Sequence, residues 1–290
     1  MRHETSPAKT DALDRLSSGI AALTSSDAWS QYLATQAKFH NYSFRNSLLI
    51  ALQRPDATQI AGFRKWLEMG RHVRKGEKGI YILAPMVCAD KDEAGEKTGT
   101  STIKGFRMVA IFDVAQTDGE DLPEICSTLI GKDPTDAYGR LECVASDLGF
   151  TVSLVDECLG KPGANGVTFF GRDAITGVGR MIQIKATNEP AQRVKTLAHE
   201  LGHAILHDPE TTPSSSRELK ELKELEAESV AFVVCEALGI DSSVYSFGYV
   251  VTWAGADKAA ELIAASGTRI QKAAHQILDA LVREPVAIAA

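Results

Sequence analysis

The sequence lacks a long hydrophobic run, a cysteine pairing pattern and an internal repeat. No apolar segment approaches the roughly 18 residues that a membrane-spanning helix needs, so we expect no contact with a membrane. The five cysteines are odd in number and scattered, without a C-x-x-C pair, which indicates reduced thiols. No hydrophobic segment follows the polar first residues, so we see no secretory signal. These absences together predict a cytoplasmic protein.

The composition is that of a globular protein, with 44% hydrophobic and 24% charged residues. A chain of 290 residues is long enough for two domains. Charge is divided unevenly along it. Residues 1–80 hold 12 Lys and Arg against 7 Asp and Glu, whereas the remaining 210 residues hold 19 basic against 31 acidic residues. This asymmetry predicts that the two halves bind different partners.

The most informative motif is His199-Glu200-Leu201-Gly202-His203. On an α-helix its two histidines lie one turn apart on the same face. They can therefore bind one Zn²⁺ and leave positions for a third protein ligand and a water. Glu200 stands where it can take the proton of that water in metal-assisted hydrolysis. The motif also occurs by chance in unrelated chains, so its surroundings decide.

The surroundings of the motif favour a metal site. An amphipathic helix is predicted to carry the motif, with Asn188 as a plausible N-cap, Pro190 in the first turn, an apolar stripe at helical spacing and Pro209 ending it. Three short strands are predicted before it, at residues 149–155, 166–170 and 179–185. A small antiparallel sheet followed by a helix with this motif is typical of zinc peptidases. We expect a peptide substrate to add as a strand at a sheet edge beside Arg180–Lys185.

The third ligand is expected on a second helix, predicted over residues 217–232 by its Leu, Glu, Lys and Ala content. Glu224 and Glu228 share one face of it with small residues, which allows close approach to Gly202. Glu224 would then bind the metal, and Glu228 would orient a histidine N–H. Glu226 is the rival ligand, because one shift of register exchanges the two. A role in supporting another ligand or at the helix end suits His207 better than ligation.

The N-terminal half is predicted to hold helices over residues 8–23, 26–39, 43–53 and 62–69. Strands over residues 80–87 and 105–114 follow, joined by a polar loop over 89–104. Basic residues cluster here beside aromatic ones, a combination that suits single-stranded nucleic acid, since cations bind phosphates and rings stack on bases. The alternative is that the aromatic residues form the core of this domain. The candidates for DNA contact are Tyr42, Arg45, Arg64, Lys65, Trp66, Arg71, Arg74, Lys75 and Lys78.

Two resemblances to known families emerge from these motifs. The segments NYSFRN (41–46), GFRKW (62–66), KGEKG (75–79) and FDVAQT (112–117) resemble the N-terminal single-stranded-DNA-binding domain of ArdC-type antirestriction proteins. The HELGH segment (199–203) together with ELEAE (224–228) resembles the ImmA/IrrE metallopeptidase family. The resemblances imply an α+β protein of two domains. Residues 1–130 would form a DNA-binding module of helices and a β-hairpin, and residues 131–290 a zincin-like domain with a small antiparallel sheet.

The resemblance to the metallopeptidases implies that Glu224 is the third zinc ligand and Glu228 its supporting partner, by a Glu-x-x-Ala-Glu pattern. From the two resemblances together, our leading hypothesis is a gluzincin-like zinc metalloendopeptidase, localised or activated by single-stranded DNA, with Glu200 as catalytic base and an unknown protein substrate. Tyr245 and Tyr249 are candidates for the oxyanion-stabilising group. Two alternatives stay open. One is an antirestriction protein that binds DNA and keeps a structural or vestigial zinc site, and the other is a regulatory peptidase that cleaves a repressor.

Overall fold

The computed structural model describes residues 7–23, 25–91, 97–120, 134–171, 179–210, 218–240 and 256–282. The chain forms two compact units, one of Met1–Ala21 with Arg45–Pro123 and one of Ala22–Phe44 with Glu124–Ala290. The α+β class with two units agrees with the sequence-based prediction. The predicted boundary at residue 130 places Ala22–Phe44 in the first domain, whereas in the structure these residues pack within the second unit. No helix among the described residues is long and apolar enough to cross a membrane.

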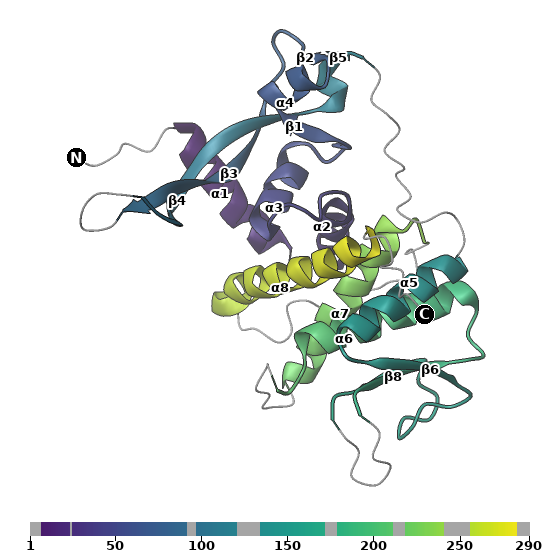
Figure 1. Cartoon of the computed structure of the whole chain (residues 1–290). Helices are drawn as coiled ribbons and strands as arrows, with labels where there is room; N and C mark the ends of the chain where they lie inside the picture. Colours follow the sequence, from purple (N-terminus) through teal and green to yellow (C-terminus); the bar gives the residue numbers. More distant parts are fainter. Residues whose placement is uncertain are drawn as a thin grey trace. The chain divides into compact units, whose positions relative to one another are not determined.

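The first unit is built on small antiparallel sheets (Figure 1). One sheet has the order β1-β4-β3, and β2 pairs with β5 in the other. Ile80, Ile82 and Ile111 are buried on one face of the β3–β4 hairpin and form its core. The elements are α1 (Pro7–Ala22), most of α3 (Phe44–Gln53), β1 (Ile60–Gly62), α4 (Phe63–Glu68), β2 (Arg71–Val73), β3 (Ile80–Lys91), β4 (Lys97–Asp113), the 3₁₀ turn η1 (Val114–Gln116) and β5 (Thr117–Gly119).

The β3–β4 hairpin is longer than predicted. Of the polar segment at residues 89–104, expected to be a loop, residues 89–91 and 97–104 instead continue the two strands, Cys88 pairs with Thr102 and Ala89 with Ser101, and residues 92–96 lie outside the described residues. The part of this segment that the structure describes is polar because both of its faces meet solvent, whereas its threonines and Ile103 favour the extended backbone. Polarity was therefore the wrong criterion for a loop here.

Two amide side chains of α3 cover the free edge of β3. Asn46 donates from Nδ2 to the Leu83 carbonyl at 2.9 Å and accepts at Oδ1 from the Leu83 N–H at 2.9 Å. Gln53, two turns further along the helix, makes the same pair of bonds with Tyr81, both at 2.9 Å. Each amide thus takes the place of a neighbouring strand, which keeps this part of the edge from pairing with another chain.

The second unit consists of helices on one side of a three-stranded sheet of order β6-β8-β7 (Figure 1). β6 runs parallel to β8 and β7 antiparallel to it, so the sheet is mixed and not wholly antiparallel as predicted. The chain forms β6 and then β7 at the two edges of the sheet. It returns antiparallel to β7 as the central strand β8, which therefore runs parallel to β6. The elements are α2 (Ser26–Lys38), α5 (Pro134–Asp147), β6 (Thr151–Val155), β7 (Gly166–Phe169), β8 (Met181–Lys185), α6 (Pro190–Leu206), α7 (Glu218–Ala237) and α8 (Ala256–Val282).

The core of this unit lies between α6, α7 and the sheet. Val194, Leu197 and Leu201 are 0% exposed, as the apolar stripe of α6 predicts. α2 packs on α7, where buried Trp29 donates from Nε1 to Ser229 Oγ at 2.9 Å. This packing of α2 on α7 accounts for the place of Ala22–Phe44 in the second unit. The packing holds α6 and α7 against each other along the faces that carry the candidate metal ligands.

Candidate metal centre

Three predicted ligands meet at one point between α6 and α7. His199 Nε2 and His203 Nε2 are 3.1 Å apart, and Glu224 Oε2 lies 3.4 Å from the first and 3.5 Å from the second. Ligands at 2.0–2.1 Å around a tetrahedral Zn²⁺ are separated by about 3.3 Å. The triangle of two nitrogens and one oxygen therefore fits a small divalent cation.

Gly202 makes this approach of the two helices possible. A Cβ on Gly202 would lie 3.0 Å from Ala227 Cα and 3.2 Å from the Ala227 carbonyl oxygen. Real side chains rarely tolerate such contacts with backbone. The close approach predicted from small residues on both faces is confirmed, and Glu224 lies one turn before Ala227 on α7. A larger residue at either position would separate the carboxylate from the histidines.

Each histidine is oriented through its second nitrogen. Glu228 Oε2 is 2.8 Å from His199 Nδ1, and since a carboxylate only accepts, Nδ1 donates. The lone pair of His199 Nε2 then points at the candidate ion. A carboxylate on the second ring nitrogen is common among metal-binding histidines, and the role assigned to Glu228 stays a prediction.

A longer chain of hydrogen bonds orients His203. Glu226 Oε2 accepts from His207 Nε2 at 3.0 Å, and His207 Nδ1 lies 2.9 Å from His203 Nδ1. Burial lowers the pKa of His207, so its ring is neutral near pH 7 and its Nδ1 accepts from His203. His203 Nε2 is thereby left with a lone pair for the ion. His207 thus supports a ligand and does not itself face the cation.

The structure distinguishes the two rival carboxylates. Glu226 is 0% exposed and bonds His207, and Arg269 of α8 lies 3.3 Å from it. Glu224 projects from the other side of α7 toward His199 and His203. Glu224 is therefore the carboxylate in reach of the cation, and Glu226 lies behind the histidines.

Electrostatics at the centre favour a cation. Burial opposes the charge of His199, but hydrogen bonds to Glu224 and Glu228 and the charge of Glu200 raise the pKa of His199 to about 10. Hydrogen bonds from His199 and His203 hold the pKa of Glu224 well below its usual value. Without a metal the cluster thus retains a proton, which an arriving cation must displace.

Glu200 is held beside this cluster by β7. The carboxylate is 6% exposed, and Thr168 Oγ1 donates to Glu200 Oε2 at 2.7 Å. Gly166 leaves space for it, because a Cβ there would come within 2.8 Å of Glu200 Oε1. Gly166 leaves room for the carboxylate and the Thr168 hydroxyl binds it. These two residues of β7 thus hold Glu200, the predicted base, against the edge strand.

A pocket of about 350 Å³ opens in front of Glu200. The sequence analysis did not name most of the residues that line this pocket. Gln192, Lys195 and Thr196 could have been found, because their spacing places them on the same helical face as His199. Thr168 and Asn165 carry no such signal, because only the fold brings β7 to α6. The lining residues are Asn165, Gly166, Gln192, Lys195, Thr196, His199, Glu200 and Glu228.

The expected site of strand addition is wrong. β8 (Met181–Lys185) is the central strand, and both of its edges are paired, with β6 and with β7. β7 is the edge strand whose first residue, Gly166, lines the pocket. Tyr245 and Tyr249, the candidates for oxyanion stabilisation, lie outside the described residues.

The candidates for DNA contact divide by exposure. Trp66 is 1% exposed and donates from Nε1 to the Phe112 carbonyl at 2.9 Å, so it is a core residue and cannot stack on a base. Tyr42 is half-buried, packs edge-on against Phe39 and belongs to the second unit. Four other aromatic residues of the N-terminal half are buried as well, but they belong to the second unit and not to the core of the first: Trp29, Tyr32, Phe39 and Phe44.

Several basic candidates bind the protein itself. Arg71 donates to Thr117 and to backbone carbonyls of the β5 segment, and Arg74 pairs with Glu77 and Asp118. Lys65 pairs with Glu68 on the same helix. The others are exposed, and no ion pair of their side chains is found among the described residues: Arg45, Arg64, Lys75 and Lys78.

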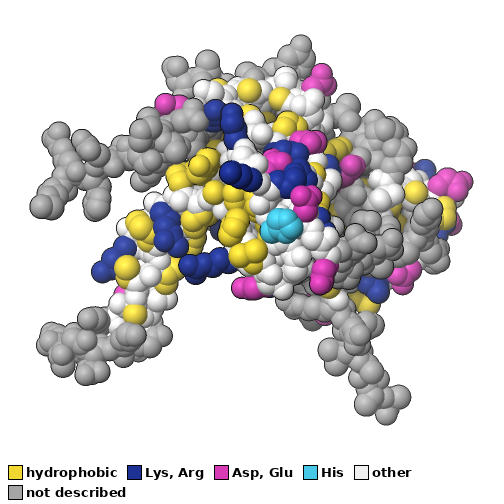
Figure 2. All heavy atoms as spheres, turned by 90° about the horizontal axis from the view of Figure 1, so that it is seen from above, with side chains coloured by type: hydrophobic (Ala, Val, Ile, Leu, Met, Phe, Trp, Pro, Cys, Tyr) yellow, Lys and Arg dark blue, Asp and Glu magenta, His cyan; other side chains and the backbone are white. Residues whose placement is uncertain are grey.

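Two exposed aromatic rings on the first unit, Tyr81 and Phe106, were missed as candidates, whereas Phe63 is one of the aromatic residues that the sequence places beside the basic cluster. Phe63 is 49% exposed next to Arg64, and Tyr81 and Phe106 are 40% and 50% exposed on one face of the β3–β4 hairpin. Alternation along the strands places them opposite the buried isoleucines, a signal that was available in the sequence. Figure 2 shows Lys and Arg side chains interspersed with hydrophobic ones on the face that it draws.

Comparison with known proteins gives two family matches. Residues 14–114 match the family described as the N-terminal domain of anti-restriction factor ArdC. Residues 161–237 match the IrrE N-terminal-like domain of the M78 peptidases. An uncharacterized protein of Bacillus anthracis is 27% identical over 246 residues, which cover 75% of this chain and 41% of that protein. The chain thus spans about two fifths of the length of this curated relative.

Solved structures of the antirestriction protein ArdC from plasmid R388 have a similar fold. The Mn(II)-bound crystal structure matches 94% of this chain and 98% of its own, with a TM-score of 0.51 and 21% identity. The metal-free one matches 83% and 85%, with a TM-score of 0.48 and 22% identity. At this identity the likeness is one of fold.

Proposed function

We propose that this chain is a metal-dependent peptidase that is localised or activated by single-stranded DNA. The premise is that it joins an ArdC-type N-terminal domain to an IrrE-like domain of the M78 peptidases. One observation carries the peptidase part. Glu200 lines a pocket beside three side chains that converge as metal ligands, and Thr168 holds its carboxylate. A purely structural metal site has no need of a base fixed at that place.

His199, His203 and Glu224 would hold the cation, for which Zn²⁺ suits the ligand set of two nitrogens and one oxygen. The ArdC structure with Mn(II) shows that this fold accepts a divalent metal in that relative. A cation there supplies Lewis acidity, which activates water and polarises a peptide carbonyl. Glu200 takes the proton of the attacking water and delivers it to the nitrogen of the leaving amine. A peptide paired with the edge strand β7 would present its carbonyl to the pocket.

The DNA part of the proposal rests on the first unit. Exposed Arg64, Lys75 and Lys78 can bind phosphates, and exposed Phe63 offers a ring on which a base can stack. Such binding does not depend on base sequence, because every base has a stacking face. We propose that DNA recruits the peptidase to its protein substrate in the cytoplasm.

The test is proteolysis by the purified, zinc-loaded chain, with and without a single-stranded oligonucleotide. Cleavage of the chain itself and of casein are the two readouts. We expect cleavage with DNA, and a loss of at least about 100-fold in Glu200→Gln, since a general base contributes that much. Zinc content and DNA binding should be unchanged in this variant, because the amide is nearly the same shape.

Glu221→Gln is the matched control, an exposed carboxylate of α7 outside the centre, and it should cleave normally. Cleavage that persists in Glu200→Gln would overturn the assigned base. Tight DNA binding without any cleavage by the wild-type chain would favour an antirestriction protein that acts by binding alone.

A further inference from the structure

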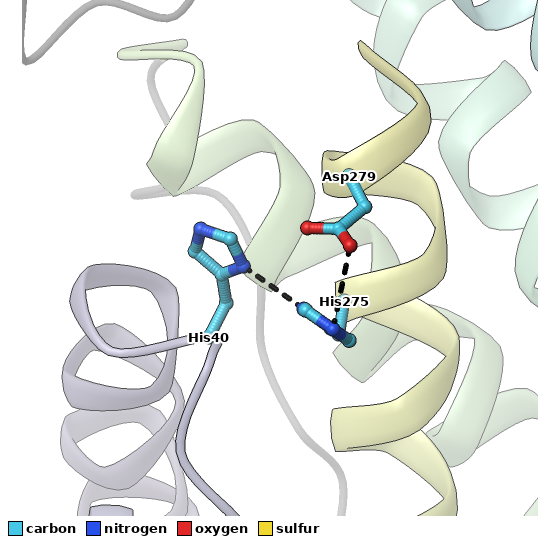
Figure 3. A group of neighbouring side chains, drawn as sticks. All are labelled: His40, His275 and Asp279. Carbon is cyan, nitrogen blue, oxygen red and sulfur yellow. Dashed lines mark hydrogen bonds and ion pairs between the residues drawn. The ribbon is translucent and has the colours of Figure 1, made fainter. Parts of the chain in front are cut away.

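A second group of potential metal ligands lies in the same unit as the first and shares no residue with it. His40, His275 and Asp279 each offer one ligand atom within 4.8 Å of the other two (Figure 3). His40 Nδ1 lies 3.3 Å from His275 Nδ1, and His275 Nε2 lies 3.5 Å from Asp279 Oδ2. Sequence analysis did not single out these residues, because 235 positions separate the two histidines.

Two elements place this cluster. His275 and Asp279 are four residues apart on α8, so they share one face of the helix. His40 comes from the turn that follows α2, and Gln271 of α8 anchors this turn by donating from Nε2 to the His40 carbonyl at 3.0 Å. Figure 3 shows the His40 ring directed at His275 across the gap between the turn and the helix. The backbone is thus fixed before any ion arrives.

The distance between the two histidines matches that around a bound ion, whereas Asp279 approaches the other ring nitrogen of His275, so its carboxylate has to turn toward Nδ1 to share the ion. Ligand atoms at 2.0–2.1 Å from a tetrahedral Zn²⁺ are about 3.3 Å apart, as the two Nδ1 atoms are. The side chains of His275 and Asp279 are 36% and 44% exposed, so an ion can enter and water can complete its coordination. In the metal-free pair one imidazole donates a hydrogen to the other, and a metal ion would replace that hydrogen.

We propose that His40, His275 and Asp279 bind a second divalent transition-metal ion. Two imidazoles and one carboxylate suit Zn²⁺, Co²⁺ or Ni²⁺ and not Mg²⁺ or Ca²⁺, which prefer oxygen ligands. The ion joins the turn after α2 to α8 and so fastens two elements that are distant in sequence. No residue placed like Glu200 stands beside this cluster among the described residues, so the assigned role is structural.

The first experiment measures zinc bound to the full chain after removal of metal with a chelator and dialysis against Zn²⁺. We expect about two Zn²⁺ per chain for the wild type, and one less in His275→Gln, since metal content follows ligand number. Asp279→Asn should bind the second ion more weakly. His72→Gln, at an exposed histidine of the first unit, is the matched control and should keep both ions.

The second experiment separates this site from the proposed peptidase centre. The variant His199→Gln/His203→Gln should still bind one Zn²⁺ and should still melt at a higher temperature with Zn²⁺ than without it. Adding His275→Gln to that variant should abolish both effects. One ion per wild-type chain that His275→Gln retains, or no ion in the His199→Gln/His203→Gln variant, would overturn the second site and leave a hydrogen-bonded histidine pair.

Discussion

At the scale of single residues, the direction of each imidazole decides whether a metal ion is bound well. Glu228 fixes His199 by accepting from Nδ1 at 2.8 Å, so Nε2 keeps its lone pair. We predict that Glu228→Ala weakens Zn²⁺ binding about 10- to 100-fold, as loss of such supporting carboxylates commonly does. Glu228→Gln should be milder, because its amide oxygen still accepts. Competition with a chromophoric chelator measures both.

Glu221→Ala is the control for this prediction, since it removes a carboxylate from the same helix at an exposed position. Equal zinc affinity in Glu228→Ala and Glu221→Ala would show that packing alone orients His199.

The choice between Glu224 and Glu226 as the third ligand belongs to the same scale. Helical periodicity in the sequence favoured Glu224, but the partners of Glu226 could not be foreseen, because Arg269 lies on another helix and meets it only in the folded chain.

At the scale of elements, the approach of α6 to α7 sets the distance from histidines to Glu224. Gly202→Ala places a Cβ 3.0 Å from Ala227 Cα, so the helices must separate slightly. We predict a stability loss of about 1–3 kcal/mol, the usual cost of overpacking, together with weaker zinc binding. Thermal unfolding and chelator competition measure the two effects.

Gly139→Ala on α5 is the matched substitution, because nothing lies within 4 Å of the added Cβ. It should stabilise the protein by up to about 1 kcal/mol through helix propensity and leave zinc affinity unchanged. If Gly202→Ala behaved in the same way, close packing of the two helices would not be what holds Glu224 in place.

The edge of β3 provides a second prediction at this scale. Asn46→Ala removes two hydrogen bonds and leaves the N–H and carbonyl of Leu83 without their partner. We expect a loss of about 1–3 kcal/mol in the free energy of unfolding, and a greater tendency to associate through the freed edge. Thermal unfolding and light scattering measure these. Asn41→Ala, at an exposed position, should change neither.

Prediction from the sequence succeeded where a pattern is local and failed where a partner is distant. The helix that carries the motif was predicted, because Pro190 and an apolar stripe mark it, although Glu189 and not Asn188 is its N-cap. The loop predicted over 89–104 was wrong for residues 89–91 and 97–104, because strands exposed on both faces are as polar as loops. The central place of β8 was also missed, since strand order depends on long-range pairing that periodicity does not record.

At the scale of the whole molecule, the two proposed activities should be separable by mutation. Arg71 and Arg74 bind β5 and acidic neighbours, so reversing their charge would disturb the fold of the first unit. Arg64, Lys75 and Lys78 are the better targets, because they are exposed and their side chains show no ion pair in the described part of the chain. Their reversal to Glu leaves the elements of the second unit untouched.

We predict that Arg64→Glu/Lys75→Glu/Lys78→Glu weakens binding to a labelled single-stranded oligonucleotide and lowers its salt dependence by about 0.7 in the logarithmic slope per lost phosphate contact. Zinc content should stay the same, and any cleavage stimulated by DNA should fall to the level without DNA. Glu200→Gln should give the reverse pattern, with full DNA binding and no cleavage. Normal DNA binding by the triple variant would show that these basic residues of the first unit are not the binding surface. Loss of zinc together with DNA binding would show that the two units do not act independently. Anisotropy titrations at several salt concentrations, with zinc analysis of the same samples, separate these outcomes.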